Sequence, residues 1–248
     1  MYKRQVVDTG SRDDTVELAE ALGCRVVRHK WKDFGANRSM SFLEASSSEE
    51  LAHLTWALAI DADMTLRCDA PRLKDFLSES RDAGFTLVQV NSGLEYRNVR
   101  LMRLSEPWQC RGVTHEYWTC RRSTVGDIPR EIAHIEDIGD GGCKSDKFER
   151  DAKLLEEGLV EEPENERYFF YMANTLACQG KTEEARDYYK KRIEAGGWAE
   201  EVWYSMYQLA KHAPDLIEAE SWVQKAQGVT DRTEALGWLV ERLSLIHI

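Results

Sequence analysis

The stretch Trp56-Ala57-Leu58-Ala59-Ile60-Asp61-Ala62-Asp63 decides the fold, because an apolar run ends there in two acidic residues. The run over residues 55–60 has the pattern of a strand that is covered on both faces, as parallel strands in α/β proteins are. In an open α/β sheet, ligands bind beyond the carboxyl ends of the strands. The sequence therefore predicts a buried strand that carries a pair of carboxylates to the ligand-binding edge of a sheet.

Strand and helix signals alternate on both sides of this run. Short apolar runs predict strands over 5–7, 25–27 and 85–90, and amphipathic segments predict helices over 11–23, 37–45 and 71–83. Ser11, with Asp14 three residues later, is expected to cap the first helix. Met40, Phe42 and Leu43 are expected to face the core in the second helix. This order predicts a mostly parallel, doubly wound sheet, with an antiparallel edge over residues 96–120.

Beyond about Cys143 every stretch has a helical pattern interrupted by glycine, asparagine or proline. A 34-residue offset places Phe169, Ala173, Leu176, Ala185 and Tyr189 on Trp203, Tyr207, Ala210, Ala219 and Val223. This period is typical of helix–turn–helix solenoid repeats, while a helical subdomain with coincident spacing is the alternative. We therefore expect an α/β domain over residues 1–143 and an all-α helical-repeat domain over residues 144–248.

The charge balance limits the classes of partner. The 248 residues include 33 basic and 44 acidic side chains, a net charge of −11, of which −4 falls in residues 1–143 and −7 in 144–248. A nucleic acid or an anionic membrane would require a basic face, so the balance argues against both. The longest apolar run is far shorter than the ~20 residues of a membrane span. Six scattered cysteines without a C-x-x-C pair favour a reducing compartment, and we expect a cytoplasmic protein.

Four residues are candidates for a ligand site at the strand ends. Asp61 and Asp63 are one residue apart and can both face one hard cation, Mg²⁺ or Mn²⁺, that bridges the diphosphate of a nucleotide. The alternative is a pair of solvated turn acids. Asp8, at the end of the first strand, either accepts hydrogen bonds from a nucleobase or ribose or organises its own turn. Arg38 either approaches the same ligand or is a surface arginine.

Several motifs, in this order, resemble family 2 glycosyltransferases of the GT-A fold that carry a C-terminal helical-repeat extension. The first domain contributes VVDTGSRDDT at 6–15, WKDFGANR at 31–38 and WALAIDAD at 56–63. The extension contributes DGGCKSDKFERD at 140–151, RYFFY at 167–171 and GGWAEE at 196–201. The resemblance implies a GT-A-like, Rossmann-like domain followed by tetratricopeptide-like repeats.

The resemblance also implies an activity and site roles. The enzyme would transfer a sugar from a nucleotide-sugar donor, such as a UDP-sugar, to a hydroxyl of a glycan, lipid-linked or protein acceptor, with inversion and with Mn²⁺ or Mg²⁺. Asp8 would contact the nucleobase, and Arg38 would lie near the base or ribose. Asp61 would lie on the ribose or metal side, and Asp63 would be the principal metal ligand.

Inversion requires a general base that takes the proton of the acceptor hydroxyl. Residues 112–118 resemble the H-E segment of related transferases, so we expect Glu116 to be the base and His115 to contact the metal or the phosphates. The alternative is that both have ordinary strand roles. Asp137 and Asp140 are rival acids, and His134 is a candidate to complete the metal site.

The sequence departs from the family pattern at two places. Met64 stands where many relatives have an acid, and the family has a further strand and helix before the Asp8 segment. We therefore expect an N-terminally truncated chain whose sheet lacks a central strand, and non-native sequence over residues 244–248. The alternative function is a non-catalytic scaffold, with a degenerate transferase domain and helical repeats that bind a protein partner.

Overall fold

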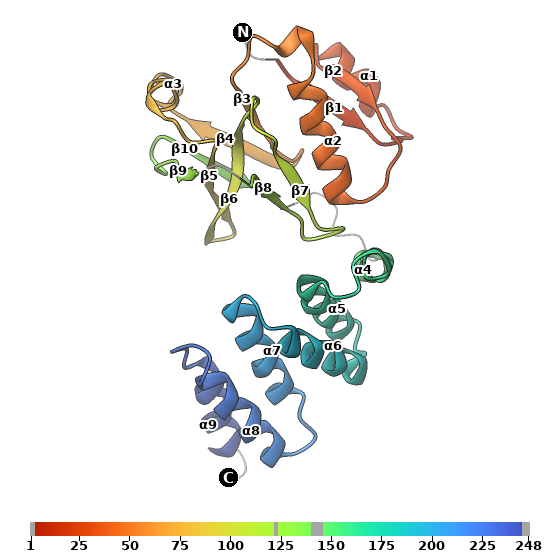
Figure 1. Ribbon diagram of the computed structural model, residues 1–248, viewed down its shortest axis with the longest axis vertical. Helices are drawn as coiled ribbons and strands as arrows, with labels where there is room; N and C mark the ends of the chain where they lie inside the picture. The colour runs from red at the N-terminus through yellow and green to blue at the C-terminus, as the bar shows by residue number, and fades with distance from the viewer. Residues whose placement is uncertain (1–2, 122–123, 140–145, 245–248) are drawn as a thin grey trace. The chain divides into compact units, whose positions relative to one another are not determined.

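The computed structural model describes residues 3–121, 124–139 and 146–244. The chain divides into two compact units, Met1–Lys144 and Ser145–Ile248. The elements of the first unit are β1 (Gln5–Asp8), α1 (Thr15–Ala21), β2 (Arg25–Arg28), α2 (Phe34–Ser46), a 3-10 turn (Glu49–Leu51), β3 (Trp56–Leu58), β4 (Met64–Cys68), α3 (Ala70–Glu79), β5 (Gly84–Asn91), β6 (Leu94–Arg103), β7 (Gln109–Arg111), β8 (Tyr117–Thr119), β9 (Val125–Asp127) and β10 (Ala133–Asp137) (Figure 1). No helix in the described ranges is long and apolar enough to cross a membrane.

The largest sheet of the first unit is mixed. Its strand order is β3-β6-β5-β10-β4, and β9 also pairs with β5. Strand β5 runs parallel to β9 and β10 and antiparallel to β6, while β3–β6 and β10–β4 are antiparallel pairs. The unit is α/β as expected, but the prediction of a mostly parallel sheet is wrong.

A tight turn between β5 and β6 explains the difference. Ser92 and Gly93 have φ values of 48° and 85°, and they connect the paired residues Asn91 and Leu94. Two consecutive residues with positive φ form the turn that best matches the twist of a two-residue hairpin. The chain therefore reverses at this point, and β6 lies inside the sheet. The pair β7–β8 forms a separate antiparallel hairpin.

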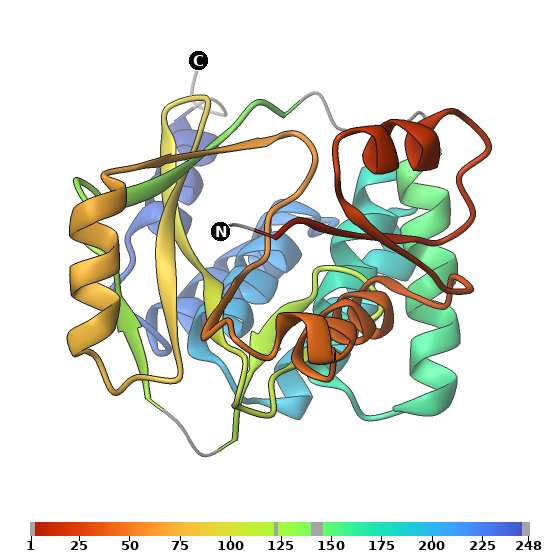
Figure 2. The ribbon, with the colours of Figure 1, turned by 90° about the horizontal axis from the view of Figure 1, so that it is seen from above.

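Strands β1 and β2, in the red segment of Figure 2, form a parallel pair of their own. In this pair Val6 is opposite Val26. Within the described ranges, no strand ladder joins this pair to the six-stranded sheet. Helix α1 begins after Asp14, whereas the amide of Ser11 donates to the carboxylate of Asp8 at 3.0 Å. The prediction that Ser11 caps this helix is wrong, because Asp8 holds Ser11 in the preceding turn.

The core of the first unit lies between the mixed sheet and its helices. Buried side chains of β5, β6 and β10 pack with partly buried residues of α3. Helix α2 contributes Phe42, which is buried, whereas Met40 and Leu43 are 37% and 56% exposed. The predicted inward orientation of the last two is wrong, because α2 packs against β7 through the face that contains Gly35, Ser39 and Phe42. Strand β3 is also only half-buried.

The second unit is all-helical over its described residues. Its helices are α4 (Lys147–Glu161), α5 (Glu166–Cys178), α6 (Thr182–Ala195), α7 (Ala199–Lys211), α8 (Leu216–Gln227) and α9 (Glu234–Ser244), and each packs against the next. A buried charge network joins three of them. Glu201 accepts hydrogen bonds from Nε of Arg192 at 3.0 Å and from Nη1 of Arg167 at 3.2 Å. Residues 245–248, where we expected non-native sequence, lie outside the described residues.

Candidate active site

The start of α2 is fixed to the loop that carries Glu116. Asp33 caps the helix by accepting the amide of Ala36 at 2.7 Å, and the amide of Gly35 donates to the carbonyl of Gly112 at 3.1 Å. These contacts satisfy amides that a helix leaves unpaired at its N-terminus. A Cβ atom on Gly35 would lie 2.5 Å from the carbonyl oxygen of Gly112, so only glycine permits this approach. The contact places the next turn of α2 beside Glu116.

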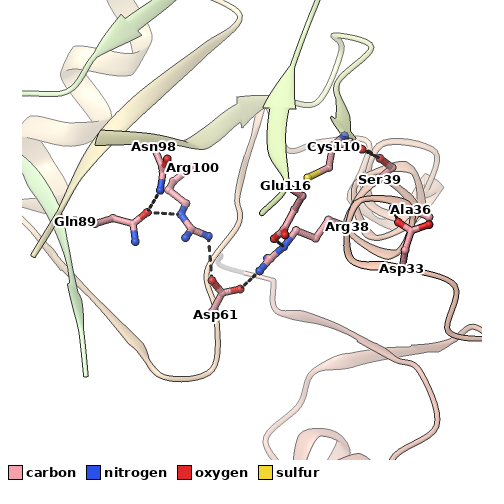
Figure 3. Close-up of polar contacts among 10 residues, drawn as sticks. All are labelled: Asp33, Ala36, Arg38, Ser39, Asp61, Gln89, Asn98, Arg100, Cys110 and Glu116. Carbon is pink, nitrogen blue, oxygen red and sulfur yellow. Dashed lines mark hydrogen bonds and ion pairs between the residues drawn. The ribbon is translucent and has the colours of Figure 1, made fainter. Parts of the chain in front are cut away.

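Four charged side chains meet where these elements converge (Figure 3). Nη2 of Arg38 lies 2.6 Å from Oδ1 of Asp61, and Nε of Arg38 lies 2.6 Å from Oε1 of Glu116. Nη1 of Arg100, on β6, lies 3.3 Å from Oδ2 of Asp61. Arg38 thus bridges two carboxylates, and Asp61 bridges two arginines. The structure brings together three of the predicted site residues, Arg38, Asp61 and Glu116.

The arginines keep Asp61 ionised. Burial alone would raise the pKa of the Asp61 carboxyl, but the charges of Arg38 and then Arg100, with their hydrogen bonds, outweigh it and lower the pKa. Burial of Arg38 favours its neutral form, and the two carboxylates beside it reverse this effect and raise its pKa. The network therefore holds compensating charges at neutral pH.

The ion pairs of Asp61 should make the folding stability depend on pH. A carboxyl whose pKa is lowered by folding stabilises the protein fully above its unfolded pKa of about 3.9, and this contribution is lost as the pH falls through the lower folded value. The difference in unfolding free energy between the wild type and Asp61→Asn should be constant from pH 7 to about 5 and shrink toward pH 3. Urea unfolding across this range measures it. Asp75→Asn, an exposed change on α3, is the control, and a difference that persists at pH 3 would refute the expectation.

Asp63 offers a carboxylate that is not engaged by arginine. Its half-buried side chain makes no hydrogen bond or ion pair with the residues that the structure describes. Its carbonyl accepts the amide of Ile138 at 2.9 Å, beside Asp137, which accepts a hydrogen bond from Asn91 at 3.1 Å. Carboxylate oxygens are ligands that Mg²⁺ and Mn²⁺ prefer. Asp63 is therefore available as a single carboxylate ligand, whereas both oxygens of Asp61 are paired with guanidinium groups.

Asp8, another predicted site residue, is held in its own turn. Asp8 accepts the amides of Gly10 and Ser11 at 3.2 and 3.0 Å, and the bonds from Ser11 lower its pKa. No hydrogen bond or ion pair links Asp8 to Arg38 within the described ranges. His115 is exposed and has a φ of 51°. Asp140, a rival acid, lies outside the described residues.

His134 lies on β10 at a distance from Asp63. It is opposite Arg67 on β4, three residues beyond Met64, which corresponds to roughly 10 Å along a strand. Its Nδ1 lies 3.1 Å from the carbonyl of Arg130. Among the described residues, no three His, Cys, Asp or Glu side chains form a group that could hold a metal. The structure therefore places Asp137, rather than His134, at the strand end nearest Asp63.

A cleft of about 210 Å³ adjoins the charged network. Its lining includes Arg38, Asn98, Arg100, Glu116, Tyr117 and Trp118. Cys110 also lines it, and burial raises the pKa of this thiol to about 12. Sequence reasoning missed Arg100 and Asn98. Two signals in the sequence place these residues on one face. They are two positions apart in a strand, and the facing apolar strand contains one polar residue, Gln89.

Comparison with known proteins identifies the family. The family described as "Glycosyl transferase family 2" matches residues 5–135. The chain therefore belongs to glycosyl transferase family 2, and the family domain is followed by a helical C-terminal region. The matched segment contains every predicted site residue, namely Asp8, Arg38, Asp61, Asp63, His115, Glu116 and His134.

The curated relatives are named as glycosyltransferases. The chain is 32% identical over 132 residues to an uncharacterized glycosyltransferase of Rickettsia conorii. The matched region covers 51% of this chain and 43% of the relative. The chain is also 28% identical over 204 residues to the SPbeta prophage-derived glycosyltransferase SunS of Bacillus subtilis. This match covers 76% of this chain and 46% of the relative. The matched parts span less than half of the length of these relatives.

Proposed function

We propose that this chain transfers a sugar from a UDP-sugar to a hydroxyl of a glycan, lipid-linked or protein acceptor, with inversion. The observation that supports this best is the continuous charge network from Asp61, after β3, through Arg38 to Glu116. The network joins the loop proposed for the donor to the group proposed as base. The cleft beside Arg38 and Glu116 offers space for a substrate.

The proposed reaction is a single displacement. The acceptor oxygen forms a bond to C1 of the sugar, and the bond from C1 to the diphosphate breaks, its electron pair remaining on the diphosphate. The hydroxyl proton passes to a carboxylate oxygen of Glu116. Nε of Arg38 lies 2.6 Å from Oε1 of Glu116, so the ion pair fixes the direction of the carboxylate. A positioned base of this kind contributes about 10²–10⁴-fold to the rate.

The leaving diphosphate gains negative charge, which a cation on the proposed donor side would neutralise. Asp63 would hold Mg²⁺ or Mn²⁺, which when bound neutralises a diphosphate. Arg38 and Arg100 hold Asp61 in a fixed direction next to Asp63. These preorganised charges support loss of the diphosphate without rearrangement of the site.

We propose that the helical unit contains tetratricopeptide-like repeats with a protein-binding role. Three of the five residue pairs related by the 34-residue offset share their burial, whereas Phe169 and Tyr207 are half-buried and their counterparts Trp203 and Ala173 are buried. Leu176 and Ala210 are both buried. The same holds for Ala185 with Ala219 and for Tyr189 with Val223. Equal burial at a fixed period is expected where successive helix pairs stack in the same way.

Titration of the full chain with UDP, with and without Mn²⁺, tests the donor assignment. We expect Mn²⁺ to tighten UDP binding by at least tenfold, about 1.4 kcal/mol. Asp63→Ala should remove this gain because its carboxylate would hold the cation. Asp75→Ala, an exposed aspartate of α3, should keep it.

The acceptor side is tested by UDP release from a panel of UDP-sugars in the presence of candidate acceptors. Turnover that depends on Asp63 supports the proposal. If UDP does not bind, or binds equally to wild type and Asp63→Ala with Mn²⁺ present, the donor assignment is wrong. In that case the scaffold function, with binding of a protein partner by the helical unit, gains support.

A further inference from the structure

Gln89 is a polar side chain buried in the central strand of the mixed sheet. It is 0% exposed, and its neighbours Leu87 and Val88 belong to the core. A buried amide that lacks hydrogen-bond partners destabilises a fold, so its position requires specific partners. The proposed reaction assigns it no role.

Three side chains of β6 bond to this one amide (Figure 3 shows two of them). Oε1 of Gln89 accepts hydrogen bonds from Nδ2 of Asn98 and Nε of Arg100, both at 2.9 Å. Nε2 of Gln89 donates to the phenolic oxygen of Tyr96 at 3.3 Å. Residues 96, 98 and 100 share one face of the strand because side chains alternate along it. Gln89 is therefore the common partner on that face.

The bond to Arg100 has a consequence for the active site. A guanidinium group is planar, so a partner that fixes Nε also sets the plane in which the other nitrogens lie. With Nε bound to Gln89, Nη1 of Arg100 lies 3.3 Å from Asp61. Arg100 is 8% exposed, so solvent offers few competing partners. Asp61 in turn contacts Arg38, and Arg38 contacts Glu116.

We propose that Gln89 is a positioning residue of the transferase: it directs Arg100 onto Asp61 and so holds the donor side of the site in its binding geometry. Only the expected effect on UDP binding and turnover rests on the proposed function. The contact between Gln89 and Arg100 is a separate claim that can be tested without turnover.

Two variants of Gln89 separate positioning from packing. Gln89→Met has a similar length and no hydrogen-bonding group, whereas Gln89→Glu keeps an acceptor for Arg100. We expect Gln89→Met to weaken UDP binding in the presence of Mn²⁺ by about tenfold and to raise the KM of the donor more than it lowers kcat. Gln89→Glu should restore the affinity to within about threefold of wild type. Val88→Ala, on the same strand, removes core packing without touching the network and should bind UDP normally.

A spectroscopic measurement tests the contact itself. The Nε–H signal of Arg100, assigned by its loss in Arg100→Lys, should exchange slowly with water in wild type and Gln89→Glu and rapidly in Gln89→Met. If wild type neither binds UDP nor turns over, the proposed function fails while this signal still tests the positioning. Slow exchange in Gln89→Met would overturn the proposal. UDP affinity in Gln89→Met equal to that of Val88→Ala, or no rescue by Gln89→Glu, would overturn it as well.

Discussion

Replacing Glu116 by glutamine is expected to lower the rate of sugar transfer by about 10²–10⁴-fold while UDP binding changes little. The amide keeps the size of the side chain and can still face Arg38 through its carbonyl oxygen, but it does not accept the proton of the acceptor hydroxyl. The rate is measured as product formed with saturating donor and acceptor, and the affinity by titration with UDP and Mn²⁺.

Glu79→Gln, an exposed change near the end of α3, provides the matched control and should leave both quantities unchanged. Urea unfolding separates loss of the base from loss of the fold. If the fold is intact, the unfolding transition of Glu116→Gln should be as cooperative as that of the wild type. A variant that retains more than a tenth of the transfer rate would show that another group takes the proton. Asp137, at the strand end near Asp63, is then the first residue to replace.

Replacing Glu201 by alanine is expected to destabilise the helical unit by about 3–5 kcal/mol. The change removes the carboxylate that pairs with Arg192 at 3.0 Å, and the Arg192 side chain is 1% exposed. Arg192 would retain only carbonyl partners, those of Gly196 and Trp198. A buried charge without an opposite charge is costly, so the effect should exceed that of an ordinary surface change. Urea unfolding of the full chain, followed by helical circular dichroism, measures the loss.

The neighbouring residue provides the control for this change. Glu200 pairs with Arg232 at 2.7 Å, but both side chains are more than 40% exposed. Exposed ion pairs contribute about 0–1 kcal/mol, so Glu200→Ala should shift the transition only slightly. Equal losses in the two variants would mean that burial does not determine the strength of these ion pairs.

The sequence predicted the alternation of strands and helices up to β5, apart from β4, and the strand end that carries Asp61 and Asp63. That part of the site is local, because an apolar run followed by two acids is visible within eight residues. The contact of Arg38 with Glu116 joins residues 78 positions apart, and only the resemblance to a family placed them in one site. The structure shows the contact and its cause, the close approach of Gly35 to Gly112.

Two features could not be predicted, for different reasons. The direction of β6 depends on the short turn at Ser92 and Gly93, which strand periodicity does not reveal. The role of Arg100 depends on the register between β5 and β6, which sets the face that meets Gln89. A shift of one residue would turn Arg100 to the opposite face, so an apolar pattern alone does not determine the residue that contacts Asp61.

The separate pair β1–β2 would link the binding of any ligand at Asp8 to a local folding equilibrium. A two-stranded sheet is at best marginally stable alone, so this pair depends on the packing of α1 and α2 rather than on a continuous sheet. Asp8 lies at its end, and the turn that holds its carboxylate directly follows β1. A ligand that contacts Asp8 therefore selects the formed state, and its apparent affinity falls in proportion to the fraction of molecules in which the pair has opened.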